Sequence, residues 1–143
     1  MSDPMADHPV YVLDSFAVLA YLSGEPGAAA VEAVLHSAAD GASRVLLSII
    51  NLGEVLYITE RSGGLHRAQE VLGLLRQLPV EILPADEPLV FSAAHIKANH
   101  TLAFADAFAV ATALQERGTI LTGDPEFRAV EALVSIAWLE KDG

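Results

Sequence analysis

The sequence contains no cysteine among its 143 residues. This absence excludes disulfide bonds, zinc sites built on thiolates and cysteine nucleophiles, so a bound metal ion would need oxygen or imidazole ligands. The five histidines show no spacing typical of metal ligands on one helix. No glycine-rich phosphate-binding motif is present either, which argues against a nucleotide cofactor. Carboxylates are therefore the side chains to consider for catalysis or metal binding.

Long apolar runs are also missing. Although 52% of the residues are hydrophobic, polar residues interrupt every stretch of about 18 residues that could cross a membrane. The first eight residues lack the basic region and the apolar core of a secretory signal. We therefore expect a soluble, cytoplasmic protein that does not contact a membrane.

Basic residues are scarce. Eight Lys and Arg stand against 19 Asp and Glu, which gives a formal net charge of −11. Such a charge repels polyanions and argues against a protein that binds nucleic acid by neutralising phosphates alone. This objection weakens if bound cations neutralise some acids, and if the few basic residues lie together near the site, namely Arg61, Arg67, Arg76 and Lys97.

Short apolar runs alternate with segments of helical periodicity along the whole chain. Runs rich in β-branched and aliphatic residues predict strands at 9–13, 45–48, 80–83, 119–122 and 134–139. Periodic segments between turn residues predict helices at 15–22, 28–39, 49–61, 65–78, 87–98 and 104–117. Because strands that alternate with helices favour a parallel sheet, we predict a three-layer α/β/α sandwich, with one domain spanning residues 1–143.

Two aspartates follow predicted strands. Asp14 comes directly after the strand at 9–13, and Asp124 follows the strand at 119–122. Open parallel sheets bind ligands beyond the carboxyl ends of their strands, so both acids are candidates for one site. A helix N-cap or a turn is an equally good interpretation of either aspartate alone. Ser15 and Thr122 lie next to these acids and could bond a carboxylate, or could serve as cap and strand-end residues.

Two further acids interrupt apolar helical segments. At helical spacing, Glu54 lies on the same side of its predicted helix as Ile50, Tyr57 and Ile58. Asp106 lies within the alanine-rich segment at 104–117. Acids on core-facing stripes are costly unless they are paired or bound to metal. A buried salt bridge is the alternative, and its candidate partners are Arg44 and Lys97.

A meeting of these four carboxylates would require compensation. Each pair about 5 Å apart repels by about 3 kcal/mol at an effective dielectric constant near 20. Carboxylate and water ligands suit Mg²⁺ or Mn²⁺ rather than zinc. A cluster of such cations is typical of phosphoryl displacement, in which the metal activates water and offsets charge on the leaving oxygen. The acids therefore suggest a metal-dependent enzyme that acts on phosphate esters.

Four segments in this order resemble the PIN-domain ribonucleases, and among them the VapC-like toxins of type II toxin-antitoxin systems. The segments are YVLDS at 11–15, NLGEVLY at 51–57, FADAFAVATA at 104–113 and LTGDPEF at 121–127. Each segment is weak alone, whereas the ordered set spans nearly the whole chain and is specific.

The resemblance implies an endoribonuclease that cleaves RNA with Mg²⁺ or Mn²⁺. Asp14 and Asp106 would be the chief metal ligands, and Glu54 and Asp124 would complete the catalytic site. The resemblance also implies a homodimer, which is inhibited by an antitoxin whose C-terminal segment covers the pocket.

Two other functions remain open. An aspartate after the first strand of an α/β sheet is also the nucleophile of small-molecule phosphohydrolases, although the usual second aspartate two residues later is replaced here by Phe16. The other alternative is a non-catalytic interaction module that keeps the fold. The presence of all four acids argues against this alternative.

Overall fold

Five parallel strands form the centre of the molecule. The computed structural model describes residues 8–140, so the two ends of the predicted 1–143 domain lie outside the described residues. The strands pair in the order β3-β2-β1-β4-β5. Their bounds are β1 (Val10–Leu13), β2 (Arg44–Ser48), β3 (Glu81–Leu83), β4 (Thr119–Thr122) and β5 (Ile136–Trp138). All four pairings are parallel, as the alternation of strands and helices predicted.

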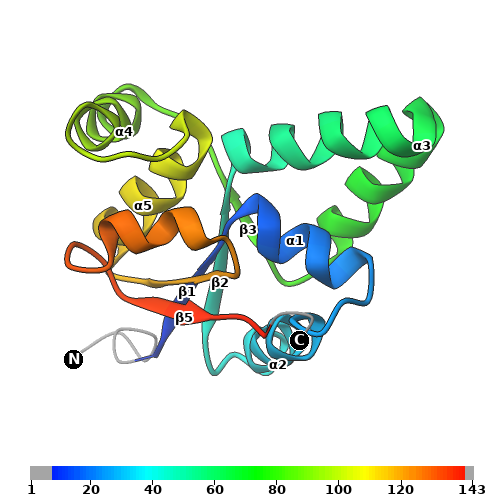
Figure 1. Ribbon diagram of the computed structural model, residues 1–143. Coiled ribbons are helices and arrows are strands. Elements are labelled where there is room, and N and C mark those ends of the chain that lie inside the picture. Colours follow the sequence, from blue (N-terminus) through cyan, green and yellow to red (C-terminus); the bar gives the residue numbers. More distant parts are fainter. Residues whose placement is uncertain (1–7, 141–143) are drawn as a thin grey trace.

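Helices cover both faces of this sheet (Figure 1). One face carries α1 (Ser15–Leu22), α2 (Ala28–Ala39) and α3 (Ile49–Gln77). The other carries α4 (Glu87–Asn99), α5 (Phe104–Glu116) and the 3-10 helix η1 (Pro125–Val130). The prediction of a three-layer α/β/α sandwich is confirmed.

The strands are apolar on both sides because both of their faces are covered. Val12 and Ile120 point into the core beneath α4 and α5, whereas Leu13 and Leu121, their neighbours in sequence, point into the core beneath α1, α2 and α3. This two-sided burial explains why the strands appear in the sequence as short continuous apolar runs.

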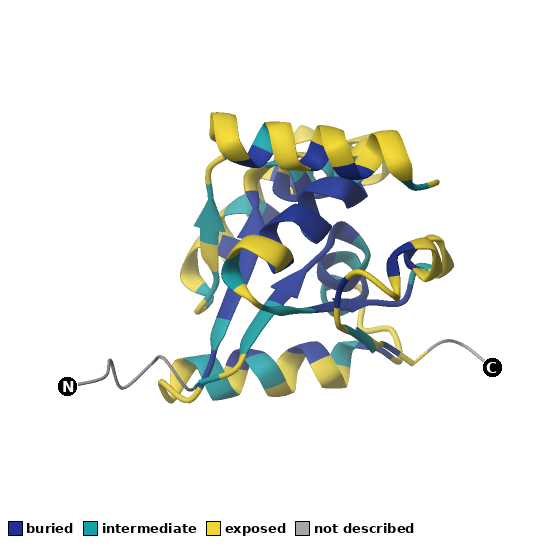
Figure 2. Ribbon diagram, turned by 90° about the vertical axis from the view of Figure 1, so that its left-hand side faces the viewer, coloured by how far each residue is buried: buried dark blue, intermediate teal, exposed yellow. Residues whose placement is uncertain are grey.

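Helix α5 is buried around most of its circumference. Residues 106–113 are all buried, and most of them are alanine or another small residue. Small side chains allow this helix to lie between the sheet, α3 and α4, and Figure 2 shows the resulting concentration of buried residues in the centre of the molecule. An acid at the start of such a helix is therefore held close to the core.

Helix α3 differs from its prediction. The two expected helices at 49–61 and 65–78 are joined, because the first continues through Ser62 and Gly63 and only Gly64 leaves the helical conformation (φ 87°, ψ 169°). Positive φ is readily adopted by glycine and costly for other residues, so the chain turns at this point. The second segment then folds back toward the sheet (Figure 1).

Smaller differences concern the ends of elements. The last strand covers 136–138 rather than 134–139, and α5 ends at Glu116 because Arg117 adopts a left-handed conformation (φ 55°). The turn after β4 continues into η1, where the sequence indicated only a helix start. Among residues 8–140, no helix has both the length and the apolar character needed to span a bilayer.

The order of the strands places a ligand-binding crevice at the centre of the sheet. From β1 the chain builds outward through β2 to β3, and it then returns to add β4 on the other side of β1. The carboxyl ends of β1 and β4 therefore flank the topological switch point, where open α/β sheets bind their ligands. Asp14 and Asp124 follow these two strands.

Candidate active site

Asp14 directly follows β1 and is the N-cap residue of α1. Its Oδ1 accepts a hydrogen bond from the backbone N–H of Ala17 (2.8 Å), and its Oδ2 accepts one from Thr122 Oγ1 (2.5 Å). The residue is only 1% exposed. Burial raises the pKa of the Asp14 carboxyl to about 7, against the opposing effect of these two hydrogen bonds. The cap interpretation is correct, and it still leaves carboxylate lone pairs for another ligand.

Asp124 is connected to Asp14 by Thr122, which forms a hydrogen bond with each of them. Thr122 Oγ1, which donates to Asp14, accepts a hydrogen bond from the backbone N–H of Asp124 (3.0 Å). Repulsion from Asp124 contributes to the raised pKa of Asp14. The Asp124 Oδ1 also caps η1 by accepting from the N–H of Glu126 (2.9 Å). Asp124 therefore combines the cap role with a place at the site.

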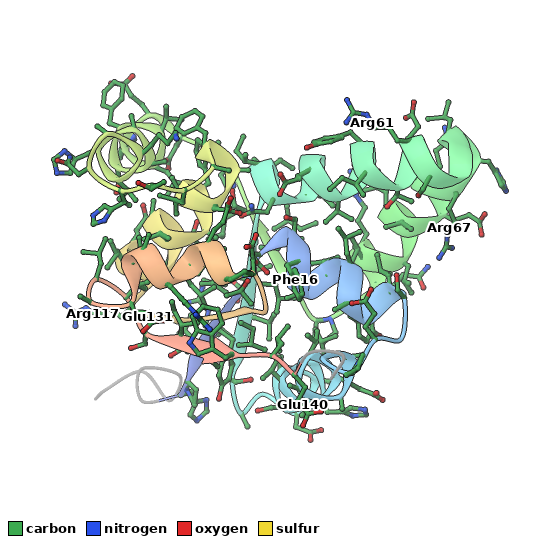
Figure 3. All side chains as sticks on the ribbon, viewed as in Figure 1. Phe16, Arg61, Arg67, Arg117, Glu131 and Glu140 are labelled. Carbon is green, nitrogen blue, oxygen red and sulfur yellow. The ribbon has the colours of Figure 1, made fainter. Side chains whose placement is uncertain are left out.

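Gly123 allows the loop after β4 to pass close to α1. A Cβ at this position would collide with the ring of Phe16. Figure 3 shows Phe16 near the start of α1. The close contact between this ring and Gly123 keeps Thr122 and Asp124 against the end of β1.

Glu54 reaches the site from α3. Ser15 Oγ donates a hydrogen bond to Glu54 Oε1, and this bond joins the start of α1 to α3. The prediction that Glu54 lies on a core-facing stripe is partly wrong, because Glu54 is half-buried and Tyr57 is 47% exposed. The reason is that this part of α3 extends beyond the end of the sheet, where no further layer covers it (Figure 1). The sequence left the roles of Ser15 and Thr122 open, and in the structure each donates a hydrogen bond to a carboxylate.

Asp106 brings the last carboxylate from α5. It is 6% exposed, and burial raises the pKa of its carboxyl to about 8, with further contributions from the charges of Asp14, Asp124 and Glu54. Such electrostatic interactions require short separations in a protein. The other three acids that the sequence singled out are therefore close enough to Asp106 for their charges to act on it.

A fifth carboxylate was missed in the sequence. Oxygen atoms of Asp106, Asp124 and Glu126 all lie within 4.8 Å of one another, and a hydrogen bond between Glu126 and Asp106 helps to raise the pKa of Asp106. In the sequence, the segment at 124–126 was interpreted only as a helix start, with Pro125 at its first position. The sequence held no clear signal for Glu126, because its approach to Asp106 depends on how η1 is directed toward α5.

Basic residues do not neutralise these acids. Arg44, a candidate partner in the sequence, is at the start of β2 and forms ion pairs with Glu81 (2.9 Å) and Glu116 (3.8 Å). Within residues 8–140, no lysine or arginine forms an ion pair with Asp14, Glu54, Asp106 or Asp124. The buried salt bridge that the sequence left open is therefore not the explanation for these acids.

Three of the basic residues that the sequence singled out do not lie together. Arg61 and Arg67 lie on the outer part of α3, away from Phe16 (Figure 3), and the Arg61 guanidinium stacks on the ring of Tyr57, 4.9 Å from its centre. Lys97 belongs to α4, which packs on the opposite face of the sheet from α3. These three residues therefore do not form the basic cluster near the site that would offset the net charge.

The donor set fits a hard divalent cation. All the ligand atoms on offer are carboxylate oxygens, and three of them lie within 4.8 Å of one another. Oxygen ligands of this kind suit Mg²⁺ and Mn²⁺. Burial is the main cause of the raised pKa values of Asp14 and Asp106, and repulsion between the acids adds to it. A bound cation would favour the ionised form of both carboxyls.

The fold and the position of these acids define an α/β protein with a carboxylate site at the switch point of its sheet. The chain belongs to the PIN domain family, whose sequence pattern matches residues 11–133. No curated protein sequence matches the chain.

Solved structures share this fold at low sequence identity. VapBC2 from Rickettsia felis, bound to a promoter DNA fragment, is 16% identical with a TM-score of 0.70, and the match covers 92% of this chain and 99% of that chain. VapC20 from Mycobacterium tuberculosis, a toxin that cleaves the sarcin-ricin loop, is 19% identical with a TM-score of 0.65, covering 85% and 94%. FitAcB from Neisseria gonorrhoeae is 24% identical with a TM-score of 0.61, covering 88% and 95%. The fold is therefore VapC-like.

Proposed function

We propose that this PIN-domain protein is an Mg²⁺- or Mn²⁺-dependent endoribonuclease. In this proposal Asp14, Glu54, Asp106 and Asp124 form the catalytic site, and Asp14 and Asp106 are the principal metal ligands. The main support for this proposal is the environment of Asp106, a buried acid whose pKa is raised to about 8 by burial and by three other carboxylates. A protein has little reason to keep such repulsion unless a cation relieves it.

The side chains of this protein then have separate tasks. Thr122 and the N–H of Ala17 hold the carboxylate of Asp14 in one orientation, and Ser15 holds that of Glu54. When bound, a divalent cation supplies Lewis acidity, which makes water a better nucleophile and offsets negative charge on the phosphodiester.

The acids further from the principal ligands would act on the attacking water. Glu54 is half-buried and lies at the solvent side of the site, where its free oxygen can accept a proton from water. Asp124 can orient the same water or hold a second ion together with Glu126. The site would thus position water and withdraw its proton with groups that the fold holds in place.

The chemistry of the site and the family support RNA as the substrate class. PIN-domain membership supports a nuclease, and VapC20 is described as a toxin that cleaves the sarcin-ricin loop, an RNA target. The net charge of −11 opposes binding of a polyanion by basic residues. Bound cations would therefore make much of the electrostatic contact with RNA, so binding and cleavage should both depend on the metal.

The test is to incubate the purified protein with labelled RNA and, separately, with a generic phosphomonoester, in Mg²⁺ and in EDTA. We expect RNA fragments in Mg²⁺ and none in EDTA, because chelation removes the charge compensation that the substrate needs. The Asp86→Asn variant is a suitable control, since it removes one negative charge from the exposed N-cap of α4 and leaves the site intact.

The other outcomes correspond to the alternatives. Turnover of the phosphomonoester without RNA cleavage would instead favour a small-molecule phosphohydrolase with Asp14 as nucleophile. Inactivity on both substrates would favour a non-catalytic interaction module. The position of Phe16 in contact with Gly123 disfavours the phosphohydrolase, because a second acid at position 16 would be needed beside the nucleophile.

We also propose that the protein is the toxin of a cytoplasmic toxin-antitoxin pair. The R. felis structure contains VapBC2, and further similar structures are toxin-antitoxin complexes, which supports an antitoxin protein as partner. A homodimer is the form that the resemblance implies, and exposed apolar residues on α3, α4 and α5 are available for protein contacts, namely Leu65, Phe91, Phe104 and Leu114.

Expression in a bacterial host tests the toxin role. We expect this chain alone to arrest growth, and co-expression of the neighbouring open reading frame to restore it, because a bound antitoxin would cover the acidic site. Growth arrest that the neighbouring product does not relieve would contradict the pairing. Normal growth with soluble, cleavage-competent protein would contradict the toxin role itself.

A further inference from the structure

The side chain of Asn51 connects the two helices that bring Glu54 and Asp106 to the site. Asn51 is the third residue of α3, one turn before Glu54, and it is fully buried. Its Nδ2 donates a hydrogen bond to the backbone carbonyl of Ala105 (3.0 Å), the residue directly before Asp106. A single side chain thus joins the first turn of α3 to the first turn of α5.

The backbone of α5 does not need this hydrogen bond. Inside an α-helix, the carbonyl of residue 105 is placed to accept from the N–H of residue 109, so it would keep a partner without Asn51. The start of α3 is capped separately, by Ser48 Oγ, which accepts from the N–H of Ile50 (3.2 Å). The bond from Asn51 is therefore additional to the ordinary hydrogen bonds of both helices.

Asn51 is also an expensive residue for this position. In the part of the chain that the structure describes, its Oδ1 is buried and has no hydrogen-bond partner. A buried amide oxygen without a partner destabilises the folded state, and an apolar side chain of similar size would avoid that cost. The placement of Asn51 is better explained by what it holds than by the stability of the core.

We propose that Asn51 is a positioning residue, which sets the separation of Glu54 and Asp106 in the metal site. The proposal rests on the metal-dependent function described above. Glu54 repels Asp106, and in the absence of a cation this repulsion tends to separate α3 from α5. A bond between the two helix starts opposes that separation and keeps both carboxylates where one cation can reach them.

The variant Asn51→Leu tests this role by direct measurement of Mn²⁺ binding, for example by calorimetry. Leucine has a similar size and removes both the hydrogen bond and the unpartnered oxygen. We expect the affinity for Mn²⁺ to fall by about 10-fold or more, which is typical for loss of a group that orients metal ligands. We expect the metal-free variant to melt at the same temperature as the wild type or higher.

Thr112→Val is the matched control. Thr112 is buried in α5, and its Oγ1 donates to the carbonyl of Phe108 (2.7 Å) within the same helix. This variant also removes one buried hydrogen bond from a side chain to a backbone carbonyl, but that hydrogen bond does not join two helices. We expect it to lower the melting temperature modestly and to leave Mn²⁺ affinity unchanged.

Two results would overturn the proposal: unchanged Mn²⁺ affinity in Asn51→Leu, or a loss of affinity that is matched by Thr112→Val. The measurement is separate from RNA cleavage. If the wild type binds Mn²⁺ and Asn51→Leu binds it weakly, while neither cleaves RNA, the positioning role holds and the proposed nuclease function fails.

Discussion

Asp106→Asn should abolish RNA cleavage while the protein stays folded. We expect kcat/KM to fall by about 10³-fold or more, because a metal ligand contributes several kcal/mol of transition-state stabilisation. The metal-free variant should be more stable than the wild type at pH 8, since asparagine removes the charge that Asp14, Asp124 and Glu54 repel. Cleavage of labelled RNA and thermal melting in EDTA measure the two effects.

A substitution that lowers activity and raises stability identifies an acid with a functional role. A structural acid in a buried ion pair would lose stability on substitution, because its partner would be left uncompensated. Unfolding of Asp106→Asn would therefore contradict the proposed site. Asp14→Asn should also lose cleavage, but with a smaller gain in stability, because Asp14 additionally accepts hydrogen bonds from Ala17 and Thr122.

Without metal, the protein should become less stable as the pH rises from 5 to 8. The pKa of Asp14 is raised to about 7 and that of Asp106 to about 8, from a normal value of 3.8. Between pH 4 and pH 8 the folded state therefore holds protons that the unfolded state has released, so stability is greatest below this window and is lost as the pH rises through it. We expect a loss of about 7 kcal/mol between pH 5 and pH 8, because Asp14 contributes over about 2 of these pH units and Asp106 over about 3, at about 1.4 kcal/mol per unit.

Metal should offset part of this loss. Mg²⁺ or Mn²⁺ binds the ionised carboxylates, so the stabilisation by metal should be largest at pH 8 and should reach about 2.7 kcal/mol at a concentration 100 times the dissociation constant. Melting curves at pH 5 and pH 8, in EDTA and in Mg²⁺, test both parts. Asp106→Asn should show a weaker dependence on pH than the wild type. Equal pH dependence in the two proteins would mean that Asp106 does not titrate in this range.

Much of the fold was predictable because its signals are local. Apolar runs on strands covered on both faces, helical periodicity and glycine punctuation each involve neighbours in sequence, and the three-layer sandwich follows from their alternation. The break in α3 was placed within 62–64, but only Gly64 departs from helical geometry. The periodicity alone does not distinguish one kinked helix from two.

The residues of the candidate site likewise fall into those with a local signal in the sequence and those without one. Asp14 and Asp124 were found through their positions after strands, and Glu54 and Asp106 because acids interrupt apolar helical segments. Glu126 was missed, since its approach to Asp106 depends on a 3-10 turn whose direction the sequence does not specify. Asn51 was missed for a similar reason, because its partner is a backbone carbonyl 54 residues away.

The sequence by itself determined the composition of the site, namely carboxylates without cysteine or a basic counterpart, and the order of the elements that carry them. Only the tertiary structure decided which acids repel one another and how far each is exposed to solvent. The physical reason is that charge repulsion and burial depend on distances between segments far apart in the chain, and those distances arise when the helices pack on the sheet. Asp106 lost most of its contact with water, and Glu54 kept more of it, only at that step.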